Sequence, residues 1–280
     1  MSNISRFHDV DFANKAIALY KDGKQVKEIS ETLKIPQSTL IQCLKRLGYI
    51  FDRSISRRIY TLDRHFFNKI DTKEKAYWLG LIYADGSNKI SQRVFAIGLQ
   101  ECDKDILILF NKDINSNNTL KDYNKNRGPI RKKMFYLMVH CKIFCEDLLK
   151  HGVFQNKTFT LNKPNINKEL FPHFIRGYFD GDGGLVSNKH KITGYIKDSA
   201  NFTGTREVLE FISEQCTELG IHTCFYKRHK NRDNNNFTIT VSGRLNVVKL
   251  CEYMYRDCGN HKLVRKYEKF LKMKNRYEKK

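Results

Sequence analysis

Two aspartates of this 280-residue chain each end an apolar segment, and their setting points to metal-assisted chemistry. Asp85 ends the segment YWLGLIYAD, and Asp182 ends the segment FIRGYFDGD. If both segments are helices, each carboxylate lies at a helix C-terminus, where the partial negative charge of the helix makes it unfavourable. A divalent cation would relieve this repulsion, because carboxylates and free end-of-helix carbonyls are hard oxygen ligands suited to Mg²⁺.

Small residues at matched spacing predict that these two helices pack against each other. Gly80 and Ala84 are four positions apart in the first segment, as are Gly177 and Gly181 in the second. Residues at this spacing share one helix face. Small side chains on that face let two helix backbones approach closely. The C-terminal ends of the helices, with their aspartates, would then lie side by side.

Each aspartate is followed by a glycine, Gly86 or Gly183, and we expect both glycines to end their helices in the left-handed conformation. The alternative is that each Asp-Gly pair is an ordinary turn. A single occurrence would be uninformative. Two occurrences, each ending an apolar helix with matched small residues, argue against that alternative.

The two segments open two repeats that share one order of elements: helix, two strands, helix, two strands, helix. The first repeat covers residues 73–157 and includes a basic loop at 121–133. The second covers 170–280, includes a basic turn at 227–236 and ends in a basic tail. Residues 158–169 are the linker between the two halves. Such a duplication predicts a pseudo-dimer within one chain.

Residues 1–50 predict a small all-α domain of the helix-turn-helix type, followed by a basic linker at 51–72. The segment KEISETLKIPQSTLIQCLKRLG resembles the helix-turn-helix of resolvases and transposases. In such a unit the last helix enters the major groove with its N-terminal residues at the base edges. The alternative is a generic three-helix unit with a solvated polar face. The side chains expected to face DNA are Gln37, Ser38, Thr39, Gln42, Lys45 and Arg46.

The charge of the chain predicts a polyanionic partner. The sequence has 51 Lys and Arg against 30 Asp and Glu, a net charge of +21. This surplus fits nucleic acid or an anionic membrane. No long amphipathic basic helix or lipidation motif favours the membrane. With 40% hydrophobic residues the chain is expected to be globular. We expect an intracellular protein, because no apolar run could cross a bilayer and no secretion signal is visible.

The eight cysteines are expected to be reduced thiols in the core, because no CxxC pair occurs and the chain is expected to be intracellular. A zinc site is the alternative, although its spacings match no common zinc pattern. Its ligands would come from His222, Cys224, Cys251, Cys258 and His261.

On these motifs the chain resembles a LAGLIDADG homing endonuclease with two motifs in one chain, over roughly residues 73–273. The resemblance implies an α+β fold of two pseudo-symmetric αββαββα halves, with antiparallel saddle-shaped sheets that lie along the DNA major groove. It also implies that Asp85 and Asp182 bind the catalytic metal with help from the carbonyls of Ala84 and Gly181. The first acid of the motif is replaced by Tyr83 in the first half. It is kept as Asp180 in the second, where we expect a structural or accessory role.

The family also places a lysine from each half near the scissile phosphates, and polar residues that organise water. The matching lysines are Lys157 in the first half and Lys266, or else Lys262, in the second. Gln100 matches a water-organising position. A nearby cation stabilises the charge that develops on phosphate and leaving oxygen. The alternative for each lysine is a solvated residue or one that binds the DNA backbone.

The resemblance therefore implies a metal-dependent, staggered double-strand break at a long site in double-stranded DNA, made by a monomer that acts as a pseudo-dimer. Mg²⁺ is the expected cofactor, and Mn²⁺ is expected to substitute. Strand parity and the basic loops suggest base or backbone contacts, although these side chains equally fit a solvated face. They are Asn88, Ser91, Arg93, Lys125, Arg127, Arg131, Asn188, His190, Lys197, Lys227, Arg228 and Lys230.

The opposing hypothesis is a DNA-binding protein that does not cleave, either a transcription regulator or an RNA-splicing cofactor built on the same fold. Such relatives usually lose one or both motif acids, whereas this chain keeps Asp85 and Asp182. An intein is disfavoured, because the chain has no starting Cys or Ser and no terminal His-Asn.

Overall fold

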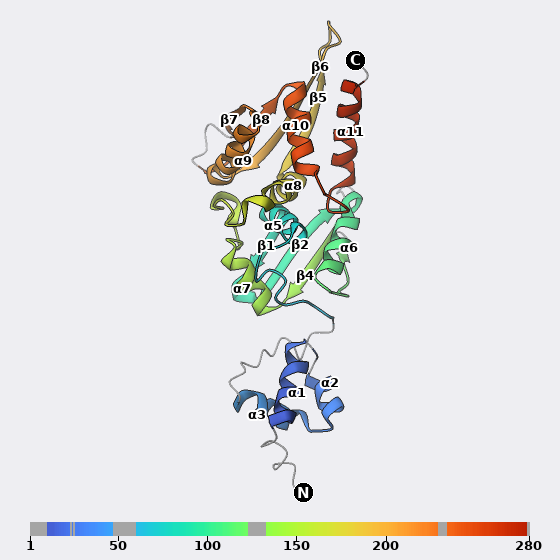
Figure 1. Cartoon of the computed structure of the whole chain (residues 1–280), viewed down its shortest axis with the longest axis vertical. Coiled ribbons are helices and arrows are strands. Elements are labelled where there is room, and N and C mark those ends of the chain that lie inside the picture. The colour runs from blue at the N-terminus through green and yellow to red at the C-terminus, as the bar shows by residue number, and fades with distance from the viewer. Residues whose placement is uncertain are drawn as a thin grey trace.

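The computed structural model describes residues 10–22, 24, 26–46, 60–122, 133–228 and 234–278. In these residues it shows a small helical unit followed by two halves that each combine helices with a four-stranded antiparallel sheet (Figure 1). The predicted α+β class with two similar halves is confirmed. No helix among the described residues is long and apolar enough to span a bilayer.

The N-terminal unit consists of α1 (Val10–Lys21), α2 (Val26–Leu33) and α3 (Gln37–Arg46). It has a hydrophobic cluster of its own, built from residues such as Ala16, Ile29 and Leu40, all fully buried. The three helices predicted from the apolar spacing are therefore present. Arg64 connects this unit to the following segment, since its Nη2 donates to the carbonyl of Tyr20 at 3.3 Å and its guanidinium lies over the Tyr20 ring.

The first half runs α5 (Lys73–Asp85), β1 (Gly86–Lys89), β2 (Val94–Gln100), α6 (Lys104–Asp113), β3 (Lys121–Asp122), β4 (Met134–His140) and α7 (Lys142–Lys150). Short 3-10 turns lie at Ile90–Gln92 and Glu101–Asp103. The strand order in the sheet is β1-β2-β4-β3.

The second half repeats this order with α8 (Phe171–Asp182), β5 (Gly183–Lys189), β6 (Ile196–Gly204), α9 (Arg206–Glu218), β7 (Thr223–Lys227), β8 (Phe237–Ser242) and α10 (Arg244–Tyr255). Two further 3-10 turns, Lys157–Phe159 and Lys168–Leu170, lie between the halves. The strand order is β5-β6-β8-β7, the counterpart of the first sheet. The predicted duplication is thereby confirmed in topology.

Local sequence explains where the two central helices begin. Thr72 caps α5, because its side chain accepts a hydrogen bond from the backbone N–H of Lys75 at 3.2 Å. Pro172 lies in the first turn of α8, where the backbone N–H that proline lacks would have no partner within the helix. Both helices are apolar over most of their surface, which suits helices buried on all sides.

One continuous hydrophobic core joins the two halves across α5 and α8, which lie side by side between the two sheets (Figure 1). Alternation along the strands gives each sheet one face toward this core. In β2, Phe95, Ile97 and Leu99 are buried, whereas Ala96 and Gly98 between them are only half-buried on the opposite face.

The segment expected to be a basic C-terminal tail instead forms a helix, α11 (Val264–Glu278). Its buried residues Lys266, Phe270 and Met273 recur at helical spacing on one face. The composition of this segment, rich in Lys and Arg, suggested an open tail. Its three buried positions could not be distinguished in the sequence from the many charged residues around them.

Candidate active site at two adjoining helix ends

Two glycines bring α5 and α8 into backbone contact. A Cβ on Gly80 would lie 2.0 Å from the carbonyl oxygen of Phe174, and a Cβ on Gly177 would lie 2.0 Å from that of Tyr77. Backbone atoms cannot yield as a flexible side chain does, so only glycine fits at either position. The two contacts are interchanged when the halves are exchanged, and the helix pair is therefore pseudo-twofold symmetric.

The same packing brings the C-terminal ends of α5 and α8 together. A Cβ on Gly181 would lie 2.2 Å from the Cβ of Ala84 and 2.9 Å from Oδ2 of Asp85. The Asp85 carboxylate thus lies against the last turn of α8, which ends at Asp182. The helix packing predicted from the small residues is confirmed.

The expectation that Gly86 and Gly183 adopt the left-handed conformation is wrong. Both are extended, with φ and ψ of −80° and 151° at Gly86 and of −110° and 171° at Gly183. Each helix passes directly into the first strand of its sheet, which requires extended backbone. Glycine is needed for a different reason, since a Cβ would lie 2.7 Å from the carbonyl oxygen of Ile82 or Phe179, respectively.

The two aspartates have raised pKa values. Burial raises the pKa of Asp85 to about 6, and the Asp182 carboxylate adds to this rise, while Lys157 and Lys266 oppose it. Burial also raises the pKa of Asp182, and the same two lysines oppose it. Both aspartates keep contact with solvent. Each carboxylate therefore lies among protein atoms that disfavour its charge but remains open to water and ions.

Lys157 lies beside the end of α5. Its side chain is buried, with 7% of the residue exposed, and its Nζ donates to the carbonyl of Gly86 at 2.5 Å. Burial lowers its pKa to about 8, while Asp182 and Asp85 raise it. The first-half lysine predicted from the sequence therefore reaches the residue directly after the motif aspartate.

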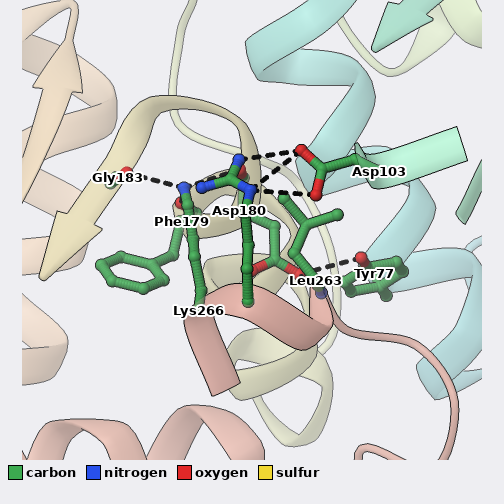
Figure 2. Close-up of polar contacts among 8 residues, drawn as sticks. Tyr77, Asp103, Phe179, Asp180, Gly183, Leu263 and Lys266 are labelled. Carbon is green, nitrogen blue, oxygen red and sulfur yellow. Dashed lines mark hydrogen bonds and ion pairs between the residues drawn. The ribbon is translucent and has the colours of Figure 1, made fainter. Parts of the chain in front are cut away.

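Lys266 lies beside the end of α8 and makes more contacts (Figure 2). Its Nζ donates to the carbonyls of Phe179 at 2.6 Å and of Asp180 and Gly183 at 2.7 Å each. Burial lowers its pKa to about 8, while Asp180 raises it. Gly183 is the counterpart of Gly86, so Lys266 is the counterpart of Lys157. Lys262 instead donates to the carbonyl of Gly259 in the preceding loop.

Asp180 has a structural position, in agreement with the expectation. Its carboxylate is buried, and Oδ2 accepts hydrogen bonds from the Tyr77 hydroxyl at 2.9 Å and from the Leu263 N–H at 2.8 Å (Figure 2). Burial raises its pKa to about 6, with Lys266 the largest opposing influence. Tyr83, at the equivalent position in the first half, donates to the carbonyl of His151 at 2.6 Å. The residues at these two equivalent motif positions therefore form different hydrogen bonds.

An ion pair between the halves, which the sequence did not indicate, lies next to Lys266. Nε of Arg265 donates to Oδ1 and Oδ2 of Asp103 at 2.9 and 3.0 Å, and its Nη2 donates to Oδ2 at 2.9 Å. The Asp103 carboxylate is almost fully buried. Its partner is 162 positions away, so no local pattern could reveal the pair. The one available signal was that Arg265 precedes a lysine already singled out.

A second carboxylate, that of Asp113, connects α5 with the second half. Oδ2 of Asp113 accepts a hydrogen bond from Nε1 of Trp78 at 2.8 Å and lies 2.6 Å from Nε2 of His261. Trp78 lies in α5, and His261 lies in the segment that leads into α11.

The donor set at the helix ends fits a hard divalent cation that is only partly held by protein. Asp85, Asp182 and the carbonyls of Ala84 and Gly181 are all oxygen donors of the kind that Mg²⁺ prefers. The described residues contain no cluster of three or more His, Cys, Asp and Glu side chains placed to bind a metal. Mg²⁺ is commonly bound by one or two carboxylates, with water and substrate phosphates completing its shell. Two carboxylates suffice for such a site.

The zinc alternative finds no support in the part of the chain that the structure describes. No metal-binding cluster of His and Cys side chains is present there, and all eight cysteines are free thiols. The residues of that alternative were His222, Cys224, Cys251, Cys258 and His261.

The side chains predicted to face DNA lie mostly on the surface. In the N-terminal unit, Thr39 is half-buried and Gln37, Ser38, Gln42, Lys45 and Arg46 are exposed on α3. Gln100 is exposed at the end of β2. Also exposed are Ser91, Arg93, Asn188, His190, Lys197, Lys227 and Arg228. Lys125, Arg127, Arg131 and Lys230 lie outside the described residues.

Asn88 is an exception, and the expectation that it contacts DNA is wrong. The residue is fully buried, and its Nδ2 donates to the carbonyls of Cys145 at 2.9 Å and Val153 at 2.8 Å. In β1 it pairs with Phe95, a core residue, and it therefore points to the helix-covered face. The helical turn at Ile90–Gln92 makes β1 short, so parity could not be read from the sequence.

Comparison with known families supports the resemblance inferred from the motifs. Residues 173–255 match the family model described as LAGLIDADG-like domain. This match lies within the second half, and the first half repeats the topology of the second. Among curated proteins, Uncharacterized protein MJ0398 of Methanocaldococcus jannaschii is 23% identical over 215 residues, covering 75% of this chain and 68% of that protein.

Several solved structures are also similar. The I-LtrWI LAGLIDADG homing endonuclease bound to target DNA is 14% identical, with a TM-score of 0.48. The match covers 78% of this chain and 92% of that protein. Meganuclease I-SmaMI bound to uncleavable DNA with a TTGT central four is 13% identical, with coverages of 71% and 87% and a TM-score of 0.48. Full-length DUF199/WhiA from Thermatoga maritima is 13% identical, with coverages of 78% and 67% and a TM-score of 0.46.

Proposed function

We propose that this chain is a site-specific DNA endonuclease that makes a metal-dependent, staggered double-strand break at a long recognition site. The observation that carries the proposal is the pair Asp85 and Asp182 at adjoining helix ends, each with a buried lysine beside it. A protein that needed only stability would not keep two carboxylates at this point, because both the helix ends and the neighbouring carboxylate disfavour their charge.

The number of such helix ends matches the number of strands in a duplex. Each half supplies one aspartate and one lysine around a pseudo-twofold axis. The two strands of DNA are also related by twofold symmetry. A single chain could therefore act on both strands without a second subunit, as the pseudo-dimer hypothesis requires.

The proposed chemistry assigns a task to each of these groups. Asp85 and Asp182, with the carbonyls of Ala84 and Gly181, would hold Mg²⁺ or Mn²⁺. When bound, such a cation lowers the pKa of water and stabilises charge on a phosphate that is being cleaved. Lys157 and Lys266 hold the residues that follow the two helix ends. They also lower the pKa of Asp85, which favours the charged carboxylate that binds a cation.

DNA is the proposed partner on grounds of charge and surface. The net charge of +21 supplies affinity for phosphate. Each sheet has a face that points away from the core, and β-strands can read base edges in the major groove. In the N-terminal unit, the exposed polar side chains of α3 would provide a further contact.

One observation favours the alternative, a DNA-binding protein that does not cleave. Lys157 and Lys266 already place positive charge near Asp85 without any metal ion. If this compensation is their only purpose, the site would be a structural remnant. The test below separates the two cases.

The proposal predicts that replacing either motif aspartate abolishes cleavage but not binding. The full chain would first be incubated with a library of random duplex DNA, and bound sequences would be recovered in Ca²⁺. We expect the native protein to cut these duplexes on both strands with Mg²⁺ or Mn²⁺. Asp85→Asn and Asp182→Asn are expected to lose double-strand cleavage, because each removes a carboxylate ligand.

Asp105→Asn, which changes an exposed acid on α6, is the matched control and should cut normally. Tight binding by the native protein without any cleavage in Mg²⁺ or Mn²⁺ would establish the non-cleaving alternative. Full cleavage by either motif variant would show that the site lies elsewhere.

A further inference from the structure

The strand registers of the two sheets identify which surface positions correspond. Gly86, at the start of β1, pairs with Ile97, and Gly183, at the start of β5, pairs with Phe202. Ile97 and Phe202 are therefore equivalent core residues beside the two helix ends. The positions on either side of them face away from the core. In the first sheet these are Ala96 and Gly98, and in the second they are Asn201 and Thr203.

The neighbouring strand extends the comparison. In the first sheet Ala96 pairs with Met138 and Gly98 pairs with Tyr136. In the second sheet Asn201 pairs with Thr240 and Thr203 pairs with Thr238. Four matched positions are thus Ala, Gly, Met and Tyr on one sheet but Asn, Thr, Thr and Thr on the other.

The first of these surfaces carries mostly apolar residues. The ring of Tyr136 lies over Gly98, where a Cβ would come within 2.3 Å of its Cε1. Met134, which pairs with Gln100 in the next row, extends the surface. We name Ala96, Gly98, Met134, Tyr136 and Met138 the apolar sheet face. All five are only half-buried.

The matched surface on the second sheet carries an amide and several hydroxyl groups. Asn201, Thr203, Thr238 and Thr240, which we name the polar sheet face, are half-buried as well. The hydroxyls of Thr203 and Thr238 lie 3.4 Å apart. Amides and hydroxyls can donate to and accept from the edges of bases, whereas alanine and glycine cannot and the methionine sulfur is only a weak acceptor.

We propose that the two sheets read their half-sites by different chemistry: the apolar sheet face contacts the methyl groups of thymines, and the polar sheet face forms hydrogen bonds to base edges. This inference rests on the proposed DNA binding. Thymine is the base that presents a methyl group in the major groove, and apolar side chains are the groups that contact it. Ala96 leaves room for such methyl groups, the Tyr136 ring over Gly98 offers them an apolar surface, and the methionines adapt to their positions.

Position and charge favour DNA as the occupant of the apolar sheet face over an apolar protein segment. The face lies in the same place on its sheet as the polar sheet face, so one duplex along both sheets would meet the two in turn. Lys121, exposed beside Tyr136 in β3, and Lys89, near the end of β1, lie at the border of the apolar residues. A cationic border suits a phosphate backbone on either side of a groove.

The experiment uses the full native chain and the duplexes recovered from the random library. In each recovered duplex, thymines are replaced by uracils, which lack only the methyl group, in one half-site at a time. We expect uracil in one half-site to weaken binding by about tenfold or more for two contacted methyl groups. Uracil in the other half-site should change binding by less than about twofold.

Two matched double variants assign the half-sites to the sheets. Ala96→Asn with Met138→Thr gives the apolar sheet face the residues of its counterpart at one cross-strand pair, and it should reduce the uracil effect severalfold. Asn201→Ala with Thr240→Met makes the reverse exchange, and it should create an effect in the second half-site. Thermal unfolding confirms that each variant is folded, and the uracil comparison on the native chain requires no variant at all.

The outcomes separate this inference from the proposed function. Equal uracil effects in both half-sites, or none in either, would overturn the inference and leave DNA cleavage untouched. If neither half-site shows a uracil effect while the native chain still binds the duplex, DNA does not contact the apolar sheet face. An apolar protein segment is then its alternative occupant. DNA that is bound with the expected one-sided uracil effect but never cut would support the inference and overturn the cleavage proposal. Failure to recover any DNA would overturn both.

Discussion

Lys157 and Lys266 occupy equivalent places beside the two motif aspartates but are held differently. Lys157 donates to one backbone carbonyl, that of Gly86. Lys266 donates to three, which is the full number of donors of an ammonium group. The end of α8 is therefore fixed by its lysine more firmly than the end of α5.

This difference predicts unequal losses of stability. Lys266→Met removes three donated hydrogen bonds, and Lys157→Met removes one. A hydrogen bond contributes about 1 kcal/mol to stability, so we expect the Lys266 variant to lose about 2 kcal/mol more of the free energy of unfolding. Urea unfolding followed by circular dichroism measures the difference. Lys262→Met, which removes one contact in a loop, should have a smaller effect than either. Equal losses for Lys157 and Lys266 would contradict the distinction.

At the scale of single residues, the sequence was informative where chemistry repeats and uninformative where contacts are distant. Asp85 and Asp182 could be singled out because the same unfavourable placement occurs twice. Asp103 and Arg265 could not, since nothing local to either residue indicates a partner in the other half. Asn88 was misassigned because its parity depends on the short helical turn after β1.

At the scale of elements, the pair α5 and α8 determines the position of both motif aspartates. Each helix presents a glycine to the backbone of the other, and each continues directly into a strand. The boundaries of these helices were predictable to within a residue or two, because an apolar run with a cap or a proline at its start has few other solutions. The conformation at their ends was not, since Asp-Gly suits both a turn and a direct passage into a strand.

Adding a methyl group at this helix pair should separate it. Gly177→Ala places a Cβ 2.0 Å from the carbonyl oxygen of Tyr77, and both helices must shift. Overpacking of this kind costs about 1–3 kcal/mol, and we expect the upper part of that range because neither backbone can rotate away. Differential scanning calorimetry should show a lower Tm. Gly184→Ala, whose Cβ would lie 3.0 Å from the flexible end of Asn201, is the matched control with a small expected effect. An unchanged Tm for Gly177→Ala would show that the helices are not in such close contact.

At the scale of the whole molecule, three units follow each other along the chain (Figure 1). The two halves share one core, while the N-terminal unit has its own hydrophobic cluster. This organisation was predictable, since duplication and a composition change are visible over tens of residues. Helix α11 was not, because its buried face consists of a few residues among many charges.

The separate N-terminal unit predicts a separable contribution to DNA binding. Changing Gln42, Lys45 and Arg46 of α3 to alanine should shorten the protected DNA at one end and leave the cleavage position unchanged. Loss of the two basic residues should also reduce the slope of binding against salt by about 1 for each phosphate contact. DNase footprinting and salt titrations measure both effects. Lys27→Ala on the exposed side of α2 is the control, and a footprint of unchanged length would assign the unit a role in packing alone.

The polar contacts between the halves limit which halves can be joined in one chain. Asp103, Asp113 and Asp180 each take a partner from the other half or from the segment leading into α11. A gene rearrangement that joined one half to a foreign half could preserve the glycine contact of α5 and α8, which depends only on small residues. It would leave Asp103 without Arg265, Asp113 without His261 and Asp180 without Tyr77, and each lost hydrogen bond or ion pair would lower stability. The two halves of this chain are therefore matched to each other. Residues on their outer surfaces can diverge freely, whereas the residues that join the halves can change only together.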